Sequence, residues 1–183
     1  VPARDRRAFL MGLGTLIGHV FFGWLGDVLE QRWPRTGRPA MAFTGLLITA
    51  PALAGFIWFG NAGATAAFFA FGVLTGLGLS SVDTGARWPI AQAVLLPEWR
   101  ATGRAAIDMV VGVVSAAVMA LSGLLADRLG LFTMLLILVP LPKLLGALTW
   151  APMFRTYGRD RAALSAALEA RRAAILTREE AAT

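Results

Sequence analysis

Long apolar runs separated by short polar segments make up most of the 183-residue chain. Five of these runs cover about residues 8–27, 40–60, 64–96, 105–126 and 131–154. Each run is close to, or longer than, the roughly 20 residues with which a helix crosses a bilayer. The runs are apolar around their whole circumference, whereas a helix of a soluble domain keeps a polar face. The pattern therefore predicts an all-α membrane protein with five transmembrane helices.

Glycine and proline mark where these predicted helices end or bend. Residues 60–63, Gly-Asn-Ala-Gly, predict a tight turn after the second run. The third run is longer than a bilayer needs, so it must tilt, kink or protrude. Pro89 predicts a kink in this run, and Pro97 predicts its end.

Two pairs of glycines have the spacing at which membrane helices often pack closely. Gly14 precedes Gly18 by four residues, and Gly72 precedes Gly76 by the same interval. The chain contains 20 glycines, so the pairs could also reflect composition alone. Both interpretations stay open from the sequence.

The two ends of the chain differ in character from its apolar middle. Residues 155–183 are rich in Arg, Ala and Glu, with apolar residues near helical spacing, and they predict an amphipathic tail helix that is polar or lies at the membrane interface. Residues 1–7 form a short basic stub without a signal-peptide cleavage pattern. Val1 is either an alternative start or a truncation point, and we favour truncation.

The distribution of arginine predicts the orientation. With five helices, one side of the membrane receives the loops that contain Arg32, Arg35, Arg38, Arg100 and Arg104, together with the tail. The other side receives residues 1–7 and Arg128. Because the side richer in Lys and Arg faces the cytoplasm, we expect a multi-pass protein of the bacterial inner membrane with a cytoplasmic tail and an extracytoplasmic stub.

Composition argues against several classes of function. The net charge of +6 comes from arginines beside the apolar runs, where they set orientation, so no nucleic-acid partner is expected. The chain has no cysteine, no metalloprotease or serine-hydrolase motif, no phosphate-binding loop and no dinucleotide-binding glycines. We therefore predict a protein that is not an enzyme and that uses no cofactor or metal.

Four ionisable residues lie well inside apolar runs: His19, Asp83, Arg87 and Lys143. A charge at the centre of a membrane helix costs roughly 2.5 to 3.5 kcal/mol on insertion scales, so such residues usually face a cavity or a partner. We predict that they line a pathway for a solute or a proton. His19 could instead be a structural hydrogen-bonding residue.

The other three residues also have structural alternatives. Asp83 and Arg87 are four residues apart, so they could simply neutralise each other on one helix face. Lys143, the only lysine, follows Pro140 and Pro142, and an ammonium can lose its proton when it is desolvated. It could bind an anion or a proton, extend towards the membrane surface, or form a structural pair.

The end of the first run resembles the signature loop of the major facilitator superfamily. Gly23, Leu25 and Asp27 match the first half of the motif, and Gly37-Arg38 match the second half after an insertion of about seven residues. Residues 123–130, Gly-Leu-Leu-Ala-Asp-Arg-Leu-Gly, also fit the motif, but an odd number of helices separates the two. Only one can be cytoplasmic, and the arginine distribution favours the first.

A second similarity lies in the third run and the loop after it. Gly76-Leu-Gly78, the end at Pro97 and the basic segment 100–105 resemble the fourth or tenth helix of that family. The resemblance covers nearly all of residues 8–154 and implies helices eight to twelve of a twelve-helix transporter, with helices two to six as the alternative. Five helices form only a partial half-bundle, so the missing N-terminal helices of the same transporter become an expected partner.

The resemblance implies a secondary active transporter that moves a small organic solute by alternating access, with proton coupling left open. In the family, the signature loop is thought to act as a conformational latch, which implies that role for Gly23, Asp27 and Arg38. A carboxylate at a helix end can pair with an arginine of the next loop. The alternative from another class is a non-catalytic scaffold or subunit of a membrane complex.

Overall fold

The computed structural model describes residues 3–182, and the side chains of residues 15–180. Within this part of the chain every regular element is helical. The elements, in chain order, are α1 (Ala3–Arg32), α2 (Gly37–Asn61), α3 (Thr65–Val82), the π-helix η1 (Asp83–Arg87), α4 (Trp88–Val94), the 3-10 helix η2 (Pro97–Trp99), α5 (Arg100–Leu129), α6 (Leu131–Leu138), α7 (Pro140–Thr149) and α8 (Met153–Ala182).

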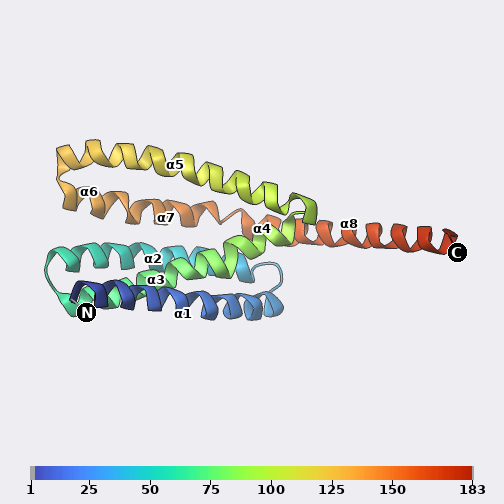
Figure 1. Ribbon diagram of the computed structural model, residues 1–183, viewed down its shortest axis with the longest axis horizontal. Coiled ribbons are helices and arrows are strands. Elements are labelled where there is room, and N and C mark those ends of the chain that lie inside the picture. The colour runs from blue at the N-terminus through green and yellow to red at the C-terminus, as the bar shows by residue number, and fades with distance from the viewer. Residues whose placement is uncertain (1–2, 183) are drawn as a thin grey trace.

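The helices run back and forth along one axis (Figure 1). α1, α2, the continuous stretch from α3 to α4, α5, and the pair α6 and α7 form antiparallel passes, while α8 projects beyond the bundle. Consequently α8 begins at the end of the bundle where α1 and α4 finish and where α2 and α5 start. We call this the basic end, because Arg32, Arg35, Arg38, Arg100 and Arg104 lie there.

Four of the passes are long and apolar enough to cross a membrane: Gly37–Asn61, Thr65–Val94, Pro97–Leu129 and Leu131–Thr149. The predicted all-helical fold is thus confirmed for the described residues, and these four helices are compatible with a membrane protein. α1 is helical but is not one of the four, and apart from Gly12 its side chains are described only from residue 15 onward. A fifth span and the transporter half-bundle stay predictions.

The boundary between the first two helices differs from the expected one. α1 was expected to end at Asp27, yet it continues to Arg32, and α2 begins at Gly37 instead of residue 40. Residues 30–32, Glu-Gln-Arg, are good helix formers, so the helix persists after the sequence stops being apolar. The connection shrinks to residues 33–36, which brings the start of α2 against the end of α1.

The expected kink near Pro89 takes the form of the π-helix η1. The amide of Trp88 bonds to the carbonyl of Asp83, five residues earlier, which is the π-helical pattern. Pro89 has no N–H and cannot bond to the carbonyl of Gly85, four residues before it. The backbone of η1 therefore offers a carbonyl to a partner outside the helix.

The last apolar run is divided more finely than expected. α6 ends at Leu138, and α7 starts with Pro140, where a missing amide hydrogen costs little because the first turn leaves it unpaired. α7 ends at Thr149, five residues before the expected boundary, and α8 begins at Met153. The tail helix α8 continues along the long axis of the bundle (Figure 1). An interfacial helix would instead lie across the end of the bundle.

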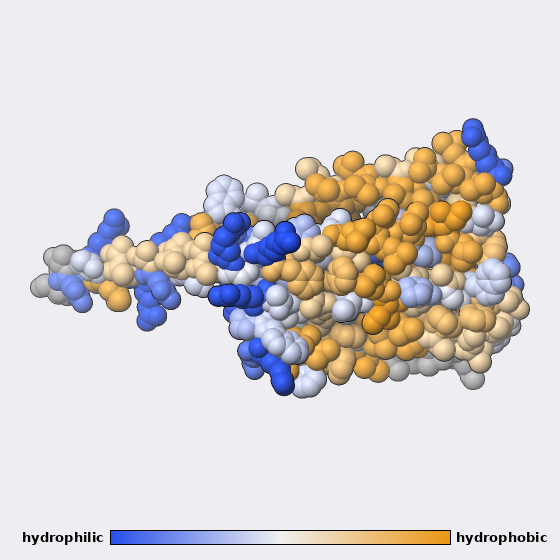
Figure 2. Space-filling view, turned by 180° about the vertical axis from the view of Figure 1, so that it is seen from behind, coloured by the Kyte–Doolittle hydropathy of each residue, from blue (hydrophilic) through white to orange (hydrophobic). Residues whose placement is uncertain are grey.

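Two parts of the bundle differ in packing. α1, α2 and α3 contact one another closely, α7 packs against α2, and the buried apolar cluster of Met41, Ala42, Ala86, Ile90 and Tyr157 lies at the basic end. By contrast, α5 buries no residue. Figure 2 shows an apolar surface over the body of the bundle, with hydrophilic groups gathered where α8 begins and along α8.

Small residues create the close contacts between α1, α2 and α3. A Cβ on Gly18 would lie 2.9 Å from Ser80 Oγ, and one on Gly76 would lie 2.9 Å from Thr15 Oγ1. Ser80 Oγ also donates to the Thr15 carbonyl at 3.2 Å. Gly18 and Gly76, each from one of the glycine pairs, therefore mark the crossing of α1 and α3, as the glycine spacing suggested.

Candidate functional site

Arg38, in the first turn of α2, is the centre of a polar network at the basic end. Its side chain is buried, and its nitrogens reach three acceptors. Nη2 lies 2.5 Å from Asp27 Oδ1, Nε donates to Glu30 Oε2, and Nη1 donates to the Gly85 carbonyl at 2.9 Å. One guanidinium thus joins α1, α2 and η1.

Local helix geometry explains why these acceptors converge on Arg38. Asp27 and Glu30 are three residues apart, so they lie on one face of α1 and point the same way. The Gly85 carbonyl is available because Pro89 supplies no amide hydrogen to it. A guanidinium carries its donors in a planar fork, which suits several acceptors at once.

The tail helix joins the same network through Glu30. Tyr157 of α8, whose side chain is fully buried, donates its hydroxyl to Glu30 Oε1 at 2.6 Å. Arg161, one turn later, places Nη1 2.9 Å from the same oxygen. The Arg38 network therefore consists of Asp27, Glu30, Arg38, the Gly85 carbonyl, Tyr157 and Arg161, and it connects four elements.

The network controls the ionisation of two of its members. Burial opposes the charge on Glu30, but hydrogen bonds from Tyr157 and Arg38 and the charges of Arg38 and Arg161 outweigh it, so the pKa of Glu30 is lowered from its ordinary value. Burial and the hydrogen bond to the Glu30 carboxylate raise the pKa of Tyr157. Glu30 is thus an anion and Tyr157 a neutral donor at neutral pH.

Gly26, and not Gly23, is the glycine that makes room for the network. A Cβ on Gly26 would lie 2.7 Å from the Gly85 carbonyl oxygen and 3.1 Å from Arg38 Nη1. A Cβ on Gly23 would make only an ordinary contact, 3.6 Å from Thr84 Cγ2. Of the residues predicted for the latch, Asp27 and Arg38 are in contact, whereas Gly23 lies outside the tight crossing.

The ionisable residues inside the apolar helices form a second group around η1. His19 of α1 shares a hydrogen bond between its Nδ1 and Thr84 Oγ1. Asp83 and Arg87 form an ion pair, with Nη2 3.1 Å from Oδ1. The guanidinium of Arg87 lies 4.6 Å from the centre of the Trp88 ring, and its buried Nε has no hydrogen-bond acceptor in the described part of the chain.

Lys143 is separated from this group. It lies partly buried on α7, which packs against α2, whereas His19 and Asp83 lie where α1 meets η1. Within the described residues, no hydrogen bond or ion pair is found for its ammonium. The structure thus brings three of the four predicted pathway residues to one region and leaves the lysine on another helix.

Sequence reasoning missed Glu30, Tyr157, Arg161 and Gly26. Glu30 was assigned to a loop because the first helix was ended too early; its spacing from Asp27 was the available signal. Tyr157 is the only tyrosine in the chain, and it lies 127 positions from Glu30, so no local pattern could pair them. Gly26 lies inside the matched motif but was not distinguished from Gly23.

No protein-family model, curated protein or solved structure matches the chain. Among the described residues there is also no group of three or more His, Cys, Asp or Glu residues that could hold a metal ion. The candidate site therefore rests on its own geometry.

Proposed function

We propose that this chain is part of a secondary active transporter, similar to the major facilitators, that moves a small organic solute across the cytoplasmic membrane by alternating access. The observation that carries the proposal is the Arg38 network, in which a buried guanidinium joins α1, α2, η1 and α8. The contacts are ionic, and the side chains lie at helix ends. In this proposal they act as the latch of one conformation.

An ionic network suits a latch for an energetic reason. The desolvation of buried charges largely cancels their attraction, so such a network adds little net stability. A conformation with the network formed and one with it opened to water can therefore be close in free energy. Alternating access requires two such states, because a solute shifts their populations only by its differential affinity for them.

The polar groups around η1 support a solute pathway. Charged residues inside membrane helices commonly mark substrate or ion routes, and π-helical turns occur frequently at functional sites. The buried N–H of Arg87 Nε has no hydrogen-bond acceptor among the described residues, which favours a solute with an anionic group. Lys143 and His19 are the residues through which transport would be coupled to protons.

Uptake into proteoliposomes tests the proposal. The full-length transporter that contains this chain, with and without a pH gradient, would be screened against sugars, organic acids and drugs. We expect uptake of an organic anion, its loss in Arg87→Gln, and no change in Arg128→Gln, which removes the same charge at the opposite end of the bundle. Lys143→Ala should alter the pH dependence; unchanged uptake and pH dependence would exclude this role for Lys143.

A scaffold or subunit role is the second candidate, favoured by α5. This helix buries no residue, although it belongs to a stretch long and apolar enough to cross a membrane. In a scaffold, helices of another membrane protein would cover α5. In the proposed transporter, other helices of the same transporter would cover it. Cross-linking from Val113 of α5 to a different membrane protein, together with no uptake of any solute, would favour the scaffold.

A further inference from the structure

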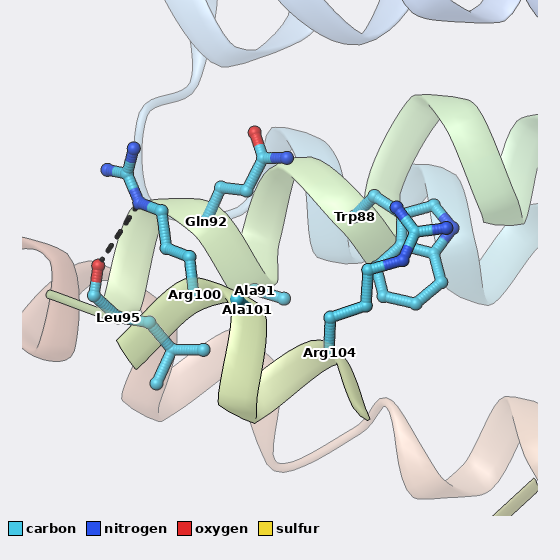
Figure 3. A pocket seen from close by; sticks show the side chains of 7 residues that line it. All are labelled: Trp88, Ala91, Gln92, Leu95, Arg100, Ala101 and Arg104. Atoms are coloured by element: carbon cyan, nitrogen blue, oxygen red, sulfur yellow. Dashed lines mark hydrogen bonds between the residues drawn. The ribbon is translucent and has the colours of Figure 1, made fainter. Parts of the chain in front are cut away.

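A pocket of about 200 Å³ lies between α4 and the first turns of α5 (Figure 3). Its polar side chains are Trp88 and Gln92 from the α4 side and Arg100 and Arg104 from α5, and Leu95 with two alanines completes it. Arg104 lies over the Trp88 ring, 4.1 Å from its centre, which holds the guanidinium against the wall. The pocket is thus lined by two cations, an amide and an indole.

The cationic groups of this pocket retain unused donors. Arg100 Nε makes one long hydrogen bond, 3.5 Å, to the Leu95 carbonyl, and Arg104 Nε lies 3.7 Å from the exposed Asp108. None of the residues that line the pocket, all within the described chain, is acidic. The nearby Glu98 pairs instead with Arg171 of the tail, at 2.6 Å. The two arginines are therefore complementary to an anion, while the rest of the wall is mainly apolar.

The position of the pocket indicates where such an anion would come from. It lies at the junction of two candidate membrane spans, Thr65–Val94 and Pro97–Leu129, and therefore at a membrane surface. Tryptophan is typical of the headgroup level, and Trp88 supplies it here. Next to the pocket, α5 presents an uncovered apolar surface that includes Val110, Val111 and Val114.

We infer that this pocket binds the phosphate of an anionic phospholipid, whose acyl chains lie along α5. Guanidinium groups recognise phosphate oxygens through paired, charge-assisted hydrogen bonds. Basic pockets between membrane helices are suited to anionic headgroups. The lipid accounts together for the unused donors of Arg100 and Arg104 and for the apolar surface of α5 next to them. The inference does not depend on whether the protein transports a solute.

Native mass spectrometry of the full chain in detergent, titrated with phosphatidylglycerol, tests the site. We expect one tight adduct with phosphatidylglycerol. In Arg100→Gln/Arg104→Gln the affinity should fall by roughly tenfold or more, since two charge-assisted contacts are lost. The matched control is Arg172→Gln/Arg178→Gln, which removes two arginines from the same end of the molecule but outside the pocket. This control should change the affinity less than about twofold, as expected for exposed distant charges.

Three results would overturn the inference. The first is unchanged affinity in the pocket variant, and the second is equal loss in the control, which indicates attraction to general positive charge. The third is displacement of the lipid by inorganic phosphate at the concentration of the lipid itself, which indicates a site for a free anion. Circular dichroism checks that helix content is kept, and the single variants Arg100→Gln and Arg104→Gln serve if the double variant unfolds.

Discussion

α3 and α5 both belong to stretches long and apolar enough to cross a membrane, yet they are buried to very different extents in the bundle. α3 buries six residues, and all are small or hydroxylated: Gly72, Thr75, Gly76, Gly78, Ser80 and Ser81. α5 belongs to the more apolar stretch and buries none. A Cβ on Gly112 or Gly123 of α5 would meet nothing within 4 Å. Hydrophobicity therefore does not decide which of the two helices is buried; α3 is buried where its small residues fit closely against α1 and α2.

The difference reflects the solvent of a membrane protein. Lipid chains are as apolar as leucine, so no hydrophobic force drives two helices together within a bilayer. Close backbone approach and hydrogen bonds stabilise the contact instead, and glycine, serine and threonine permit both. If this explanation is correct, variants in the packed region of α1, α2, α3 and α8 should lower stability, while equivalent variants in α5 should not.

The largest effect is expected from Arg38→Ala. Removing the buried guanidinium breaks its pairs with Glu30 and Asp27 and should cost about 3 kcal/mol. This is the lower end for a broken buried pair, because Asp27 is exposed and Glu30 keeps Tyr157 and Arg161 as partners. Arg104→Ala in α5 breaks an exposed pair with Asp108 and should cost less than about 1 kcal/mol. Unfolding in SDS, followed by circular dichroism, compares the two. Equal costs would contradict the distinction between the regions.

Gly26→Val should have the next largest effect. Its new side chain would collide with the Gly85 carbonyl, which as backbone cannot rotate away, and overpacking of this kind costs about 2 kcal/mol. Gly112→Val makes the same chemical change in α5, where nothing lies within 4 Å, and should leave the melting temperature nearly unchanged. Tryptophan fluorescence during heating measures both. A lower melting temperature in Gly112→Val alone would reverse the comparison.

Tyr157→Phe should have a smaller effect, because it removes one hydrogen bond and keeps the ring. The loss of the bond to Glu30 should cost about 1 kcal/mol. The variant should also loosen α8, so trypsin should cut after Arg159 and Arg161 faster than in the wild type. Cleavage after Arg128, at the opposite end of the bundle, is the internal control. Unchanged cleavage at both places would mean that Tyr157 does not hold the tail.

The smallest effect is expected from acidification through Glu30. The pKa of Glu30 is lower in the folded protein than its ordinary value of 4.5, so the unfolded chain binds the proton first as the pH falls. The stabilisation is therefore complete above pH 4.5 and is lost as the pH drops through the lowered pKa. Melting temperatures between pH 7 and pH 3 should fall less steeply in Glu30→Gln than in the wild type. Parallel curves would show that Glu30 adds no pH dependence.

The sequence predicted some parts of the site because they are local. Asp27 and Arg38 flank one short connection, so the motif that contains both was enough to bring them together. Asp83 and Arg87 are one helical turn apart, and their pairing was likewise foreseeable. His19 and Thr84 belong to different helices, and only the crossing of α1 with η1 joins them.

Other parts could not be predicted because they depend on contacts between distant segments. The role of Glu30 depends on where α1 ends. The helix propensity of residues 30–32 extends α1 to Arg32, beyond the end that the apolar run predicted at Asp27. The pairing of Glu30 with Tyr157 depends on α8 leaving the bundle beside α1. The pocket between α4 and α5 depends on how two helices turn at Pro97, which composition does not describe.

The amino-acid sequence by itself determined that the chain is helical and apolar enough for a membrane, where its helices bend, and which end carries the arginines. These properties follow from each residue's transfer free energy and backbone preference. Tertiary structure alone decided which apolar helices are buried, which acceptors surround Arg38, and that α5 stays uncovered. In lipid, hydrophobicity does not distinguish a packed helix from an exposed one, so that choice is made by the fit of small residues across a crossing.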